Sequence, residues 1–180
     1  MFEFLKDLFD PKPEPKPEPV TIKNEFGKFS IDSFLYDHTY SGETNVPCIS
    51  GKGNMHAYVE CDDKETLTAT KGFERLSEVL KNLPEWDERL KKIALDFAVE
   101  TYLLDDGTLE IWGNADPGDE DYFIDWTTQE DFLKRISINN VHVYSDGKLE
   151  FFIDLDGMYT DHGLEVDIDK EGNVVYCDLV

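Results

Sequence analysis

Four residues of the types needed for acid–base catalysis lie close together late in the chain. They are Asp154, Asp156, Asp161 and His162, and a carboxylate near an imidazole can orient a general base. A base must also have a group to act on, and no Ser or Cys of the chain stands in a recognisable nucleophile motif. We therefore expect His162 to bond to the backbone of a loop. A hydrolase or metal-dependent enzyme that uses these four residues, with His162 and Asp161 as its catalytic pair, remains the alternative.

A second set of carboxylates has a spacing that could hold a metal ion. Asp167, Asp169, Glu171 and Asp178 lie near the positions of a calcium loop, in which alternate oxygens wrap one cation. The flanking residues have the pattern of strands, whereas the calcium motif needs helices. Alternating acids in a half-buried strand explain the same spacing. We therefore expect no metal and no cofactor here.

A third set combines aromatic residues with carboxylates and has the composition of a protein-recognition patch. Large aromatic side chains beside a charge field of one sign are typical of surfaces that bind other proteins. The residues expected to bind a partner are Trp112, Asp116, Asp119, Glu120, Asp121, Tyr122, Trp126, Tyr159 and His162.

The charge of the chain points to the same class of function. The 180 residues include 17 Lys or Arg and 40 Asp or Glu, which gives a net charge of −23. Residues 101–180 hold 20 of these acids and 4 of the bases, a net charge of −16. Such acidity excludes a nucleic-acid backbone binder and disfavours docking on anionic lipid. We expect a non-enzymatic domain that binds a basic protein, with a toxin-neutralising immunity protein as one concrete form.

The location of the protein follows from its cysteines and its first residues. Cys48, Cys61 and Cys177 include no closely spaced pair, which suits reduced thiols. The first nine residues are too few and too acidic for a signal peptide, and no segment is long enough for a membrane-spanning helix. We expect a cytoplasmic protein.

A proline-rich spacer divides the chain into three parts. Residues 11–19 have proline at every second position, which favours an extended polyproline II rod. Residues 1–10 precede it and carry Phe2, Leu5, Leu8 and Phe9 near helical spacing. This short segment is either a frayed terminus or an element that docks on a partner. Residues 20–180 are expected to form a single domain.

Apolar spacing in this domain predicts helices and strands. It predicts helices over residues 73–83 and 84–104, and the pair Thr127 and Glu130 has the pattern of a capping box that opens a short third helix. Strand patterns cover residues 26–31, 46–50, 55–61 and 109–112, whereas residues 113–125 and 154–163 are rich in turn formers.

Two hairpins are expected at the end of the chain. Asp146 and Gly147 form the turn of the first, and the second has apolar residues 164, 166 and 168 alternating with acids. One face of this sheet should therefore be apolar and the other acidic. The sequence predicts an α+β fold, in which an antiparallel sheet of N-terminal strands and two C-terminal hairpins packs against about three helices.

Several motifs resemble one known family. They are Phe26-Gly27-Lys28-Phe29, Tyr40-Ser41-Gly42, the segments 128–136 and 141–147, and the segment 156–166. Over residues 26–180 the chain is similar to the bacterial domain-of-unknown-function 2262 family (DUF2262). The most distinctive motif is an aromatic residue three positions before a histidine, here Tyr159 and His162, with Asp161 where the family pattern has glycine. The resemblance implies a bacterial protein with no assigned activity and no cofactor.

Overall fold

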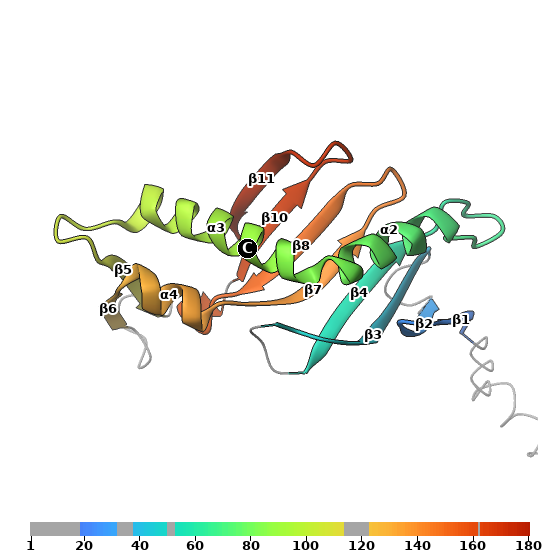
Figure 1. Cartoon of the computed structure of the whole chain (residues 1–180), viewed down its shortest axis with the longest axis horizontal. Coiled ribbons are helices and arrows are strands. Elements are labelled where there is room, and N and C mark those ends of the chain that lie inside the picture. The colour runs from blue at the N-terminus through green and yellow to red at the C-terminus, as the bar shows by residue number, and fades with distance from the viewer. Residues whose placement is uncertain (1–18, 32–37, 50–52, 114–122, 162) are drawn as a thin grey trace, which may run out of the picture.

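The computed structural model describes residues 19–31, 38–49, 53–113, 123–161 and 163–180. Figure 1 shows the helices in front of a large sheet, which runs from β1 at one edge to β11 at the other. In these ranges the helices are α2 (Thr70–Lys81), α3 (Leu83–Tyr102) and α4 (Gln129–Arg135). The strands are β1 (Thr21–Asn24), β2 (Gly27–Ile31), β3 (Thr39–Pro47), β4 (Asn54–Glu60), β5 (Leu109–Gly113), β6 (Phe123–Thr127), β7 (Ser137–Val143), β8 (Leu149–Asp154), β9 (Met158–Asp161), β10 (Gly163–Ile168) and β11 (Val174–Leu179).

The strands form a large sheet and a small one. The large sheet has eight strands in the order β1-β2-β3-β4-β7-β8-β10-β11, and the small sheet has the order β6-β5-β9. Within the large sheet, β4 and β7 are parallel and the other neighbours are antiparallel. A parallel pair needs a long crossover, and the chain between β4 and β7 supplies it with all three helices.

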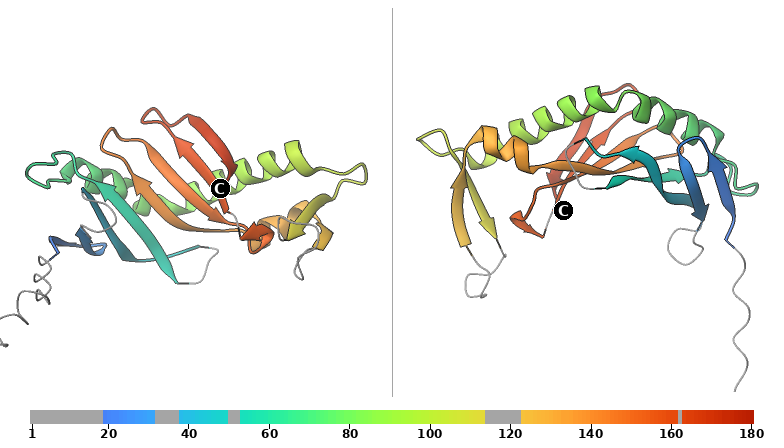
Figure 2. Two further views of the ribbon diagram at one scale, coloured as in Figure 1. Left: turned by 180° about the vertical axis from the view of Figure 1, so that it is seen from behind. Right: turned by 60° about the horizontal axis from the view of Figure 1, so that its bottom comes forward.

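The helices cover one face of the large sheet. Both views in Figure 2 place α2 and α3 on the same side of it. Residues on that side are buried in alternation along each strand, for example Ala57 and Val59 on β4 and Phe151 and Ile153 on β8. Leu90 and the other buried residues of the helices meet them in one continuous core. Alternation with a period of two thus places every second strand residue on the face away from the helices.

The sequence predicted the fold class correctly. The structure has the expected α+β fold, a mostly antiparallel sheet that packs against three helices among the described residues. Both C-terminal hairpins are present as β7–β8 and β10–β11, and Gly147 adopts the positive φ that its turn requires.

Some boundaries differ from the prediction. Of the segments predicted to be turn-rich, 113–125 includes the start of β6 and 154–163 contains β9, and β1 was not predicted. The short helix α4 is capped by Thr128 and not by Thr127, because the Thr128 hydroxyl accepts the hydrogen bond from the Asp131 backbone N–H. Thr127 instead ends β6 and is buried.

Two of the three predicted parts of the chain lie wholly or mostly outside the described residues. They are residues 1–10 and the proline-rich spacer. In the described part of the chain, no helix combines the length and the apolar character that crossing a membrane requires.

The packing of α2 on β4 depends on Gly72. A Cβ atom at this position would lie 2.5 Å from Cγ1 of Val59. We expect Gly72→Ala to lower the free energy of unfolding by about 1–3 kcal/mol, although alanine is the better helix former. In a Val59→Ala background the contact with Cγ1 disappears and only the carbonyl oxygen of Glu60, at 3.3 Å, stays close, so the same substitution should then cost much less. Urea denaturation of the four proteins measures this difference, and an equal effect in both backgrounds would contradict it.

Candidate functional site

The face of the large sheet away from the helices carries a concentration of acidic and aromatic side chains. We call its portion from β4 to β11 the acidic face, and none of the described helices packs on it. Six carboxylates lie on it with one Lys. Its residues are His56, Tyr58, Glu60, Asn140, His142, Tyr144, Lys148, Glu150, Phe152, Asp154, Glu165, Asp167, Tyr176 and Asp178.

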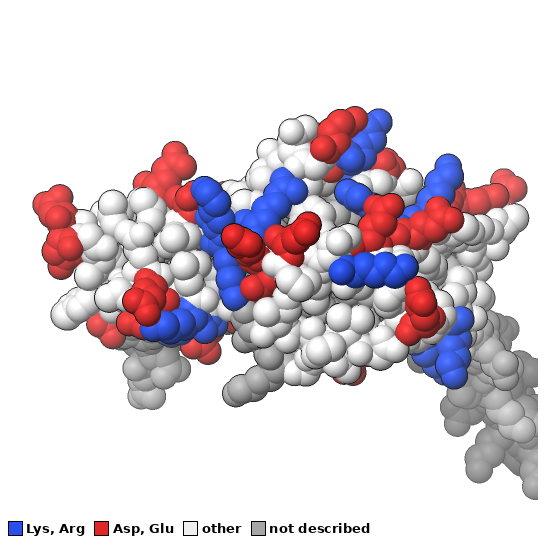
Figure 3. Space-filling model, in the orientation of Figure 1, with Lys and Arg blue, Asp and Glu red and all other residues white. Residues whose placement is uncertain are grey.

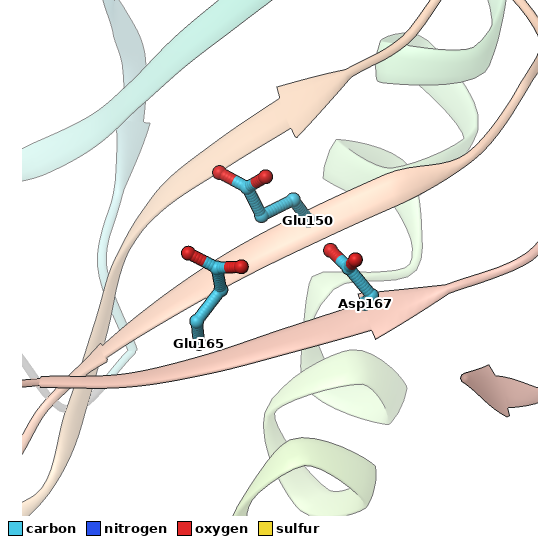
Figure 4. Close-up of side chains that lie close together, drawn as sticks. All are labelled: Glu150, Glu165 and Asp167. Carbon is cyan, nitrogen blue, oxygen red and sulfur yellow. The ribbon is translucent and has the colours of Figure 1, made fainter. Parts of the chain in front are cut away.

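Carboxylates stand directly opposite one another on neighbouring strands of this face. Glu150 on β8 is the register partner of Asp167 on β10, and Glu165 on β10 is the partner of Asp178 on β11. Oxygen atoms of Glu150, Glu165 and Asp167 lie within 4.8 Å of one another. Figure 4 shows these three side chains pointing toward one another from the two strands. Because like charges in direct cross-strand pairs oppose sheet formation, this arrangement costs folding free energy.

Lys148 offsets only part of this charge. Its Nζ lies 3.0 Å from Oδ2 of Asp167 and 4.0 Å from the centre of the Tyr144 ring. Glu165 forms no hydrogen bond or ion pair with the described residues, and burial together with Glu150 and Asp167 raises its pKa. The cluster therefore keeps an excess of negative charge.

A row of aromatic rings crosses the acidic face beside these carboxylates. The ring centres of His56 and Tyr58 lie 4.8 Å apart, those of Tyr58 and His142 5.7 Å, and those of His142 and Tyr144 4.2 Å. Burial lowers the pKa of His142, which favours the neutral imidazole. The Tyr144 hydroxyl donates a hydrogen bond to Glu150, and burial raises the pKa of this phenol. These neutral rings give the acidic face a surface that can contact apolar atoms as well as cations.

Two polar atoms on the acidic face lack partners. Nε2 of His142 and Oδ1 of Asp167 are each almost inaccessible to solvent, and neither has a hydrogen-bond partner among the described residues. Buried polar atoms are normally paired. These two atoms are half of the four buried side-chain atoms without a partner among the described residues.

The helix-covered side has a different charge. Residues 70–102, which span α2 and α3, hold six Lys or Arg and seven Asp or Glu, a net charge of −1. Figure 3 shows both signs mixed on this side of the molecule. Almost all of the net charge of −23 therefore lies outside the two long helices.

The predicted aromatic patch is divided between surface and core. Trp126 and Ile124 on β6 are exposed, with 66% and 59% of their surface accessible. Trp112 is half-buried, with its ring edge-to-face on Tyr159. Tyr159 is only 1% exposed, stacks on Tyr102 and donates a hydrogen bond to the carbonyl of Glu110. In this structure Tyr159 is therefore a core residue and does not present a binding surface.

The remaining predicted binding residues lie outside the described residues. They are Asp116, Asp119, Glu120, Asp121, Tyr122 and His162.

The carboxylates of the predicted catalytic segment have structural partners. Asp156 forms an ion pair with Arg135 at 3.1 Å, and the carbonyl of Asp156 accepts a second hydrogen bond from the same guanidinium. Oδ1 of Asp154 accepts the backbone N–H of Asp156, which fixes the turn before β9. Asp161 ends β9, but its side chain lies outside the described part, as does His162.

The predicted calcium residues are distributed over a hairpin. Asp169 and Glu171 lie in the turn, where Asp169 accepts hydrogen bonds from the backbone and the side chain of Asn173. Asp167 and Asp178 lie on the two strands, with different register partners. Asp167 instead belongs to the group with Glu150 and Glu165, the one set of possible metal ligands among the described residues. Its Oδ2 already contacts Lys148, which disfavours a divalent cation there.

Sequence reasoning missed the central residues of the acidic face. His142, Tyr144, Lys148 and Glu150 were not among the predicted site residues. The available signal was the alternation of polar and buried residues along residues 137–154. That alternation shows that a strand has a polar face, but not which strands lie beside it.

The comparisons with known proteins place the chain among proteins of unassigned activity. A family model described as an uncharacterised protein conserved in bacteria, DUF2262, matches residues 23–179. Neither the curated proteins nor the solved structures contain a match to the chain.

Replacing Glu165 should stabilise the protein at neutral pH. Because the pKa of Glu165 is raised on folding, its ionised form opposes folding above its ordinary pKa of 4.5. We expect Glu165→Gln to raise the free energy of unfolding by about 0.2–1 kcal/mol at pH 7 and to change it little at pH 4. Urea denaturation at both pH values measures the effect. Glu100→Gln, on the exposed side of α3, serves as a control without this pH dependence, and a destabilised Glu165→Gln variant at pH 7 would refute the argument.

Proposed function

We propose that this chain, which belongs to the DUF2262 family of uncharacterised bacterial proteins, is a non-enzymatic domain that binds a basic protein. The acidic face is its docking surface. We also keep the cytoplasm as its expected location, in line with the free thiols of Cys48, Cys61 and Cys177.

The observation that carries the proposal is the uncompensated charge of a sheet face that none of the described helices covers. Glu165 and Asp178 oppose each other and form no ion pair with the described residues, and Glu150 opposes Asp167, which pairs with Lys148. A partner that brings Lys or Arg side chains to this face would relieve the repulsion. The same field would steer a basic partner toward the surface and increase its association rate.

A binding role also agrees with the structural roles of two predicted catalytic residues. Asp154 holds a turn and Asp156 pairs with Arg135, so two of the four residues of the enzyme alternative have structural roles. An immunity-type protein, which neutralises a toxic partner by covering it, is the concrete form that we favour.

The exposed side chains of β6 supply an apolar part of the same interface. Ile124 and Trp126 lie two residues apart, so they share one face of the strand. Tryptophan is enriched among the residues that dominate binding energies. We propose that Trp126 contacts the partner while the carboxylates attract it.

Capture of a partner tests the role of the charges. The tagged full-length chain is exposed to a lysate of its native bacterium at about 50 mM and about 500 mM salt, since screening weakens exposed charge pairs. We expect a bound basic protein at low salt that is released at high salt. The double variant Glu165→Gln/Asp178→Asn should retain at most about a third of it.

A matched variant separates the acidic face from net charge. Glu74→Gln/Glu88→Gln also removes two negative charges, but from exposed positions on α2 and α3. It should capture as much partner as the unmodified chain. Equal losses in both variants, or a bound protein that resists high salt, would show that the acidic face does not select the partner.

A second prediction concerns Trp126. Because this side chain is 66% exposed, Trp126→Ala should change the free energy of unfolding by less than about 0.5 kcal/mol. We expect it to reduce capture of the same partner by at least about threefold. Ile49→Ala, at an exposed apolar residue beyond β3, is the control and should leave capture unchanged. Full capture by the Trp126→Ala variant would remove β6 from the interface.

A further inference from the structure

We infer that the basic partner adds a strand to the free edge of β11, with cationic side chains over the acidic face and apolar side chains on the helix side. The inference rests on the proposed function and specifies how the partner is held. Main-chain hydrogen bonds at a sheet edge give affinity, and the alternating side chains of the added strand give specificity.

The outer side of β11 has no neighbouring strand among the described residues. β11 is the last strand of the large sheet, and of the described strands it pairs with β10 alone. Gly163 and Val180 exchange both of their backbone hydrogen bonds, so in this antiparallel ladder residues 178 and 176 also turn their N–H groups toward β10. Cys177 and Leu179 therefore direct their N–H and C=O groups outward. The N–H of Leu179 accordingly bonds to the side chain of Asp178 and not to β10.

Exposed apolar side chains gather at this edge. Val174, Val175 and Tyr176 are 41%, 58% and 41% exposed, and they are consecutive residues. Proteins normally protect a sheet edge with charges, proline or a covering element, because an exposed apolar edge pairs with other chains. A bulge at Val175 shields the start of β11, but the register from Tyr176 to Leu179 is regular. This regular segment can therefore accept another strand.

The two sides of β11 define the chemistry of the added strand. Tyr176 and Asp178 lie on the acidic face, opposite Asp167 and Glu165. Cys177 and Leu179 lie on the helix side, opposite the buried residues Val166 and Leu164, and pack against the core. Partner residues beside Tyr176 and Asp178 would contact carboxylates. Partner residues beside Cys177 and Leu179 would contact apolar atoms. The partner segment is therefore an extended one in which Arg or Lys alternates with apolar residues.

The charge of β11 favours a basic partner over a second copy of this chain. Pairing of two β11 edges would bring the carboxylates of both acidic faces to the same junction. Like charges in neighbouring strands oppose such pairing, whereas Arg or Lys would neutralise them. Each copy also carries a net charge of −23, which repels the other.

Defined peptides test strand addition on the full-length chain. The probe is a capped hexapeptide of alternating Arg and Val, and the control has the same composition as three Arg followed by three Val. NMR titration at low salt measures affinity, and hydrogen exchange measures protection of the Cys177 amide. We expect the alternating peptide to bind at least about tenfold more tightly and to protect this amide.

Blocking individual backbone groups makes the test specific. Two further forms of the alternating peptide carry N-methyl groups either on all Val amides or on all Arg amides. Only one set faces β11, so one form should lose at least about tenfold in affinity and the other should not. In the protein, Cys177→Pro removes the outward N–H without touching the bonds to β10, whereas Cys177→Val keeps it. The Cys177→Pro variant should bind the alternating peptide at least about tenfold more weakly than the Cys177→Val variant.

The outcomes separate this inference from the proposed function. Equal affinity of all peptides, with Glu165→Gln/Asp178→Asn weakening them all, would overturn strand addition and leave the acidic docking surface standing. No charge-dependent binding of any peptide, together with failed capture from the lysate, would refute both. Protection of the Cys177 amide that rises with protein concentration in the absence of peptide would identify a second copy as the occupant and overturn the inference.

Discussion

The described helices all pack against one face of the large sheet, and the other features of the structure depend on that constraint. Because side chains alternate along each strand, burying Phe151 and Ile153 beneath α3 forces Glu150 and Phe152 onto the opposite face. The same alternation places Glu165 and Asp167 there. The apolar core thus determines the register, and the register brings the carboxylates together. A slip by one residue would bury the acids, so the core fixes the acidic face firmly.

This arrangement stores unfavourable electrostatic energy in a stable fold. Glu165 opposes Asp178, and the raised pKa of Glu165 reflects that environment. Uncharged polar residues at these positions would fit the same backbone at lower cost. Residues that oppose folding locally are common at functional sites, where the cost is met by the rest of the structure. Here the continuous core beneath α2 and α3 offsets this cost, so the acidic face can persist although none of the described helices covers it.

Local patterns in the sequence were sufficient to predict most helices and strands, but not which strands lie beside one another. Gly147 and the alternation from Leu164 to Ile168 identified both C-terminal hairpins and their two-sided character. The strand β6 was missed because it begins within the turn-rich segment 113–125. The strand β9 was missed because it is short and pairs with β5, which is far away in sequence. Tyr159 was expected in a binding patch, but contacts with Tyr102 on α3 and Trp112 on β5, both distant in sequence, bury it. The side chains of His142, Glu150 and Asp167 likewise lie together because of the strand order, which no local pattern encodes.

The strong negative charge of the chain opposes the self-association that its exposed apolar edges would otherwise favour. Trp126 on β6 and Val175 on β11 lie on the edge strands of the two sheets, where unpaired backbone invites association between copies. A net charge of −23 opposes that association over the whole surface, because every copy repels every other. The same charge attracts a basic chain and lowers the barrier to its approach. An edge that would be an aggregation hazard in a neutral protein is thereby kept open, as the proposed addition of a strand from a basic partner requires.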